Sequence, residues 1–159
     1  MSKSKYFMFG FLLLLVSAVW AQEPVKVVVT HSILADFAQN VGGDLVDLTI
    51  LVGRDGDAHE YEPTPQDSVA IADAELIFEN GLGFETWLGD LYTASGSSAS
   101  RVVVTEGIVP RAIEGEEHAE DHAEEYEHGE FDPHVWHNPQ LVMTIVDNIA
   151  AALSRVDPK

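Results

Sequence analysis

The sequence contains no cysteine, and this absence limits both its covalent chemistry and its metal chemistry. No disulfide can form within the chain, and no thiolate can act as a metal ligand. Any transition metal that the chain binds must therefore be held by histidine nitrogens and carboxylate oxygens. That ligand set favours zinc or manganese.

Basic residues are scarce as well. Eight lysines and arginines stand against 27 aspartates and glutamates, which gives a formal net charge of -19. Such a chain repels nucleic acids and anionic lipid surfaces, and it concentrates cations around itself. We therefore expect no nucleic acid or other polyanion among its partners.

Long apolar runs are confined to the amino terminus. Lys3 and Lys5 precede an apolar stretch at 6–16, and small residues then lead to a cleavage site after Ala21. This pattern predicts a secretory signal peptide at 1–21, because the stretch is shorter than the roughly 20 residues that span a bilayer. No cysteine follows for lipid attachment, so we expect a soluble protein in a Gram-negative periplasm.

Beyond the signal peptide, strand patterns and helix patterns alternate, and residues 22–159 suffice for one domain with its own core. The patterns predict strands at 25–30, 46–52, 75–79 and 101–105, and helices at 33–41, 65–72, 84–92 and 139–156. Such alternation is typical of βαβ units. The expected fold class is α/β, with a parallel β-sheet flanked by helices.

Two histidines lie in loops that contain proline. His59 stands in Asp-Ala-His-Glu-Tyr-Glu-Pro at 57–63, and His134 stands in Asp-Pro-His-Val-Trp-His-Asn-Pro at 132–139. The first loop follows the second predicted strand and the other follows the fourth, so both can converge at the carboxyl edge of the sheet. Imidazole is the commonest ligand for zinc and related metals, which makes His59 and His134 the primary candidate ligands. Binding should weaken as the pH falls, because a protonated imidazole cannot bind a metal.

Residues 114–130 interrupt the alternating pattern with nine acidic residues and three histidines. The segment has almost no apolar side chains to offset its ordering entropy, so a loop is predicted. One interpretation is a solvated acidic linker. The other is weak auxiliary metal binding by His118, His122 and His128, because Asp121 and Glu125 supply oxygens near the first two.

In five segments the chain resembles the zinc/manganese solute-binding proteins of ABC importers, most of all the periplasmic zinc-uptake type. These are the strand and helix at 27–44, the His59 loop at 53–65, the stretch at 76–87 with Asn80-Gly81, the acidic histidine-rich loop, and 132–139. The resemblance implies two α/β lobes joined by a long helix, with the metal held between them. His59 and His134 match the two ligands of the first lobe.

The resemblance also implies which metal is transported, which membrane protein is the partner, and which lobe lies outside this sequence. Zinc is the expected cargo, with manganese less favoured, and an ABC permease in the inner membrane is the expected partner of a monomeric, non-enzymatic protein. The sequence stops at Lys159, about where the linking helix would begin, so we expect 22–159 to correspond to the N-terminal lobe, with the C-terminal lobe absent. A gene fragment or a truncated record is the simplest explanation, and a stable single-lobe protein is the less favoured one. Two ligands alone predict weakened affinity.

Two other functions remain open from the sequence. A secreted zinc hydrolase could use Glu60 as its general base, although no His-Glu-x-x-His motif is present. A periplasmic metal buffer or chaperone could act through the acidic loop alone.

Several neighbouring residues have simpler interpretations. Glu60 and Glu62 either fix the tautomer of His59 or are ordinary solvated loop residues. We interpret the remaining residues as structural or surface residues: His31 at a helix start, His137 at the surface, and Trp87 and Trp136 in packing.

Overall fold

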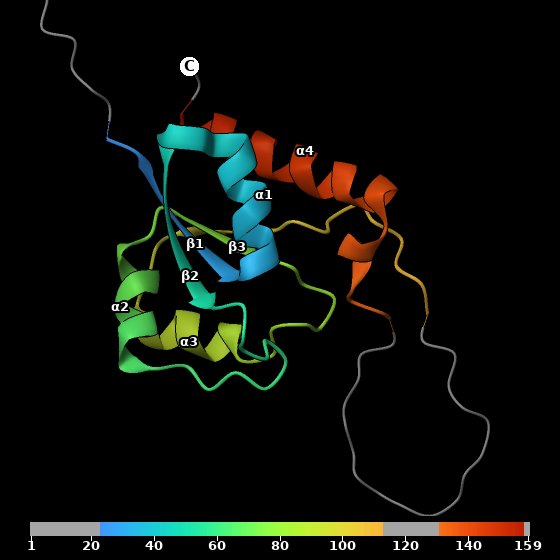
Figure 1. The fold of residues 1–159 in the computed structure, drawn as a ribbon. Helices are drawn as coiled ribbons and strands as arrows, with labels where there is room; N and C mark the ends of the chain where they lie inside the picture. Colours follow the sequence, from blue (N-terminus) through green and yellow to red (C-terminus); the bar gives the residue numbers. More distant parts are fainter. Residues whose placement is uncertain (1–22, 113–130, 158–159) are drawn as a thin grey trace, which may run out of the picture.

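Within the residues that the computed structural model describes, 23–112 and 131–157, four strands form one parallel sheet (Figure 1). The strands are β1 Val25–His31, β2 Val46–Val52, β3 Leu76–Glu79 and β4 Ser100–Val103. The helices are α1 Ser32–Gly42, α2 Pro65–Asp73, α3 Leu88–Ser95 and α4 Pro139–Val156, with short 3-10 turns η1 Gly43–Leu45 and η2 Val135–His137. The predicted α/β class is confirmed.

The strand order is β2-β1-β3-β4, and every neighbouring pair is parallel. The chain therefore goes from β1 to β2 on one side and then returns past β1 to β3 on the other. This reversal places a topological switch point at the carboxyl ends of β1 and β3. Ligands of open α/β sheets bind in the crevice outside such a point.

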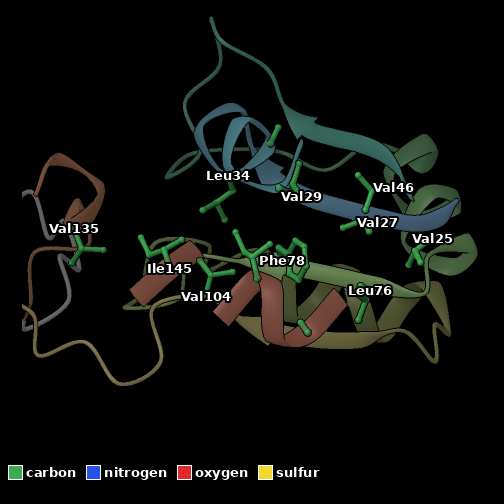
Figure 2. Packing of buried hydrophobic residues seen from close by; sticks show 14 residues of the cluster. Val25, Val27, Val29, Leu34, Val46, Leu76, Phe78, Val104, Val135 and Ile145 are labelled. Carbon is green, nitrogen blue, oxygen red and sulfur yellow. The ribbon is translucent and has the colours of Figure 1, made fainter. Parts of the chain in front are cut away.

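The face of the sheet that carries α1 and α4 holds the larger apolar cluster (Figures 1 and 2). Val27 and Val29 project from β1 into this cluster, where they meet Leu34 of α1 and Ile145 of α4. The β1 strand is buried almost throughout because its other face is covered too. A continuous β-branched run is the sequence pattern of such a strand.

The opposite face is covered by α2 and α3 (Figure 1). Val28 of β1 and Ile77 of β3 meet Ile71 of α2 and Leu88 of α3 in this second cluster. Phe84 belongs to the same cluster and is 5 % exposed. Because Phe84 lies at the carboxyl edge of the sheet, the cluster extends directly beneath the loops that follow the strands.

The predicted element boundaries hold within a few residues, except at the start of α3. The helix begins at Leu88 rather than at residue 84. Before it, Gly81, Leu82 and Gly83 have positive φ angles of 77°, 57° and 78°. The Glu85 carboxylate accepts the backbone N–H groups of Asn80 and Gly81, so it closes a turn where helical spacing had predicted a helix.

Two predicted segments lie outside the described residues: the signal peptide at 1–21 and the histidine-rich loop at 114–130. In the part of the chain that is described, no helix is both long enough and apolar enough to cross a membrane.

Candidate metal centre

The loop between β2 and α2 carries His59. The Oδ1 atom of Asp57 accepts the backbone N–H of His59 at 2.8 Å, which turns the chain so that the histidine follows a tight bend. On the inner side of the loop, the indole N–H of Trp87 donates to the carbonyl of buried Ala58 at 2.8 Å. The backbone on the amino-terminal side of His59 is thus held at two points.

The loop before α4 carries His134 in a similar bend. Oδ1 of Asp132 accepts the backbone N–H of His134 at 3.0 Å and contacts its ring Nδ1 at 2.8 Å. The His134 backbone N–H, followed by the His134 ring, lowers the pKa of Asp132. A carboxylate can only accept in this contact, so Nδ1 carries the ring proton and Nε2 keeps its lone pair. That is the tautomer that a metal requires.

The two imidazoles meet through their Nε2 atoms, which lie 3.3 Å apart. Two nitrogen ligands at about 2.05 Å from a tetrahedral zinc ion would be separated by about 3.3 Å. The contact is a hydrogen bond in which Nε2 of His59 donates to the lone pair of His134 Nε2, and its length is close to the spacing of two nitrogen ligands on one ion. His59 and His134 are both exposed, so an ion could reach them from solvent.

Phe84 lies against both candidate ligands. Its ring centroid is 4.3 Å from that of His59 and 5.9 Å from that of His134, both with edge-on geometry. Trp136 completes the apolar side of the site, at 5.2 Å from Phe84 and 5.2 Å from His134. This aromatic support restricts ring motion, so the two histidines are partly oriented before any ion arrives.

A buried polar chain runs behind Phe84. The Thr30 hydroxyl donates to Oε1 of Glu85 at 2.6 Å, and its oxygen lies 3.1 Å from Nδ1 of His31. Because the hydroxyl proton points to Glu85, Nδ1 of His31 is the donor to Thr30. Burial lowers the pKa of His31 to about 4 and raises the pKa of Glu85. His31 is thus a neutral, buried residue.

The structure separates the remaining histidines from the pair. His31 caps the start of α1, and its ring packs on Phe84 and Trp136, in agreement with its predicted structural role. His137 is exposed and stacks beside His134, with 6.5 Å between ring centroids. His118, His122 and His128 lie outside the described residues.

The carboxylates that the sequence suggested as supports are exposed. Glu60 and Glu62 both lie at the surface, and a role for them in fixing His59 stays a prediction. In the described part of the chain, no group of three or more histidine, aspartate or glutamate side chains could hold a metal ion. The pair His59 and His134 would therefore supply two ligands of a larger set.

Sequence reasoning assigned no site role to three of the residues that shape the site: Asp132, Phe84 and Asn80. A usable signal existed for Asp132, because both loops contain the same Asp-x-His spacing at 57–59 and 132–134. An aspartate two residues before a position commonly folds back on its N–H. From the sequence, Asn80 is named only as part of the resemblance at 76–87, and Phe84 gave no comparable signal.

Comparison with known proteins places this chain in a family. The model of the ZnuA family, described as zinc-uptake complex component A, periplasmic, matches residues 27–159. The chain belongs to the ZnuA family. The matched residues include both histidine loops.

Curated relatives of this ZnuA-family chain carry metal-transport names. It is 37% identical over 145 residues to the metal ABC transporter substrate-binding lipoprotein FimA of Streptococcus parasanguinis, covering 87% of this chain and 44% of the relative. It is 36% identical over 142 residues to the manganese ABC transporter substrate-binding lipoprotein PsaA of Streptococcus mitis, covering 86% and 43%. The chain thus spans less than half the length of these relatives.

Solved structures of similar proteins share the fold. A zinc-bound ZnuA deletion mutant superposes with a TM-score of 0.74 at 30% identity, covering 86% of this chain and 48% of that one. A manganese-bound periplasmic metal-binding protein from Candidatus Liberibacter asiaticus gives 0.71 at 31% identity, covering 84% and 46%. The chain thus covers a little under half of each of these structures.

Proposed function

We propose that this chain forms the metal-capturing lobe of the solute-binding component of an ABC importer. In this proposal His59 and His134 hold one divalent transition metal ion and deliver it to a membrane permease. The observation that carries the proposal is the 3.3 Å separation of the two Nε2 atoms. The metal ABC transporter names of the relatives support it.

Zinc is the cargo that this lobe suits best. Neutral imidazoles are preferred by zinc over manganese, which favours carboxylate, carbonyl and water oxygens. The spacing of the pair also matches a tetrahedral ion. Relatives named for manganese make manganese the competitor against which zinc must be tested.

The proposed location of the protein is the periplasm, and its proposed oligomeric state is a monomer. The predicted signal peptide at 1–21 and the periplasmic family description support export. Relatives are named lipoproteins, whereas these 159 residues contain no cysteine that could carry a lipid. In the same proposal His118, His122 and His128 assist capture weakly.

Calorimetric titration of zinc and manganese into the chain from Gln22 onward tests the proposal. We expect zinc to bind with defined stoichiometry and more tightly than manganese. The double substitution His59→Ala/His134→Ala should abolish this binding, whereas deletion of 114–130 should preserve it. His137→Ala removes an exposed neighbouring imidazole and is the matched control.

Other results would favour another function. Binding that follows 114–130 alone would indicate a metal buffer. Ester or peptide hydrolysis that is lost on chelation would indicate an enzyme, contrary to the substrate-binding names of the relatives.

A further inference from the structure

Asn80 occupies the point where the end of β3 meets the loop that carries His134. The residue is 0 % exposed. Its side-chain nitrogen donates to the carbonyl of Gly81 at 3.1 Å and to the carbonyl of Pro133, 53 residues away, also at 3.1 Å. Pro133 immediately precedes His134, so one amide group connects the sheet to the backbone of a candidate ligand.

The orientation of this amide follows from its partners. Both carbonyl oxygens can only accept hydrogen bonds, so the Asn80 side chain must present its NH2 group to them. The reverse orientation would place three oxygens together in a buried site. The contact with Pro133 is therefore a directed one, which apolar packing alone could not replace.

The backbone of Asn80 is itself fixed on both sides. Its N–H donates to Oε1 of Glu85 at 2.8 Å, and its carbonyl accepts the hydroxyl of Thr105. The following left-handed turn includes Leu82 at a φ of 57°, a conformation that persists only where surrounding contacts impose it. These contacts fix the position of the Asn80 amide against the His134 loop.

We propose that Asn80 is a positioning residue for metal capture. It acts through the carbonyl of Pro133 and sets where the His134 ring stands relative to His59. The inference rests on the proposed function, because it assumes that the pair binds metal. Ligand geometry must be held to within about 0.5 Å for tight binding, and the residue that fixes the loop is then part of the site.

The test compares Asn80→Ala with Asn148→Ala. Asn148 makes the same kind of hydrogen bonds away from the histidine pair: its side-chain nitrogen donates at 2.9 Å to the carbonyls of Val104 and of Glu106. Zinc affinity is measured by chelator competition, and folding by urea denaturation. We expect Asn80→Ala to lower zinc affinity by about 10-fold to 100-fold, the range for residues that orient metal ligands. Asn148→Ala should leave affinity unchanged.

A double-mutant cycle separates positioning from general destabilisation. In a His134→Ala background, Asn80→Ala should change the residual zinc affinity by less than about twofold, whereas in a His59→Ala background the loss should persist. Equal losses of zinc affinity in the two backgrounds, or no loss of affinity in either, would overturn the proposal. If Asn80→Ala does not fold, Asn80→Ser serves in its place, because its hydroxyl can stay near Gly81 but is too short to reach Pro133.

A metal-free measurement keeps this inference distinct from the proposed function. Amide hydrogen exchange at His134 and Val135 should accelerate in the Asn80 variant relative to exchange in β1. If zinc does not bind at the histidine pair but exchange accelerates, the proposed function fails while the positioning of the loop stands. Unchanged exchange at both amides would contradict the positioning role of Asn80, whatever the outcome for zinc.

Discussion

At the residue scale, burial strongly alters the ionisation of the His31 side chain. It is 5 % exposed, and burial lowers its pKa from 6.5 to about 4. Its ring packs on Phe84 and Trp136, the two residues that also support His134. The unfolded chain would therefore accept a proton at His31 more readily than the folded chain does.

This difference predicts acid sensitivity between about pH 6.5 and pH 4. In that window the unfolded state binds more protons at His31, so the free energy of unfolding falls as the pH falls. A shift of this size corresponds to a loss on the order of 3 kcal/mol. Glu85 has the opposite effect on the pH dependence of stability. Its raised pKa gives a contribution to the free energy of unfolding that is fully present below its ordinary pKa of 4.5. That contribution is lost as the pH rises through the raised pKa.

Urea denaturation of wild type and of His31→Gln between pH 7 and pH 4.5 isolates the histidine contribution. The difference between the two proteins should shrink as the pH falls, because only wild type loses the His31 contribution. His137→Gln is the control, because its ring is exposed. Parallel pH profiles for wild type and His31→Gln would contradict the prediction.

The sequence identified the candidate ligands but not all of their supports. Loops that contain proline and follow predicted strands were enough to single out His59 and His134. The support for His134 is not evident from residue type, because it depends on a bend in the backbone. Asp132 reaches the Nδ1 atom of His134 only because its own carboxylate folds back two residues along the chain.

At the scale of elements, periodicity predicted strands and helices well where packing decides them. It failed at 84–87, where Phe84, Trp87 and Leu88 have helical spacing but belong partly to a turn. There the hydrogen bonds of one carboxylate, Glu85, outweigh helix propensity. Such a bond depends on a conformation that includes positive φ angles, which a hydrophobic pattern does not encode.

The turn predicts a graded response to alanine at its glycines. Gly81 has a φ of 77°, and an added Cβ would lie 2.6 Å from Cγ1 of Val103, whereas Gly83 has a φ of 78° but open space around it. Gly83→Ala should cost about 1 kcal/mol for backbone strain alone. Gly81→Ala should cost about 1–3 kcal/mol more, because Val103 must move.

Urea denaturation of the two variants measures this difference, with Gly89→Ala as control. Gly89 lies in α3 with nothing near its added Cβ, so alanine there should stabilise the protein by about 0.5–1 kcal/mol. Equal losses at Gly81 and Gly83 would show that the contact with Val103 does not constrain the turn.

At the scale of the whole molecule, topology explains why distant histidines meet. The parallel strand order brings the loops after β2 and β4 to one edge of the sheet, near the switch point between β1 and β3. Sequence reasoning could reach this convergence from the alternation of strands and helices alone. It could not reach the 3.3 Å spacing of the Nε2 atoms, which depends on bends, buried amides and ring packing in three separate loops.

The charge of the molecule predicts how fast it captures a cation. The sequence has a formal net charge of -19, and Asp55, Glu60 and Glu62 are exposed in the loop that carries His59. Attraction of this kind acts over about 10 Å at 0.1 M salt and is screened as salt rises. The association rate of zinc should fall about tenfold between 10 mM and 500 mM salt. The dissociation rate should change little, because coordination bonds are short-ranged.

Stopped-flow fluorescence can follow the reaction through Trp136, whose ring centroid lies 5.2 Å from that of His134. Neutralising Asp55, Glu60 and Glu62 to the corresponding amides should flatten the dependence on salt. The same number of charges removed at Glu23, Asp44 and Asp47, all exposed at the opposite end of the sheet, should flatten it less. An association rate that is constant across this range of salt would mean that the acidic surface does not steer the metal.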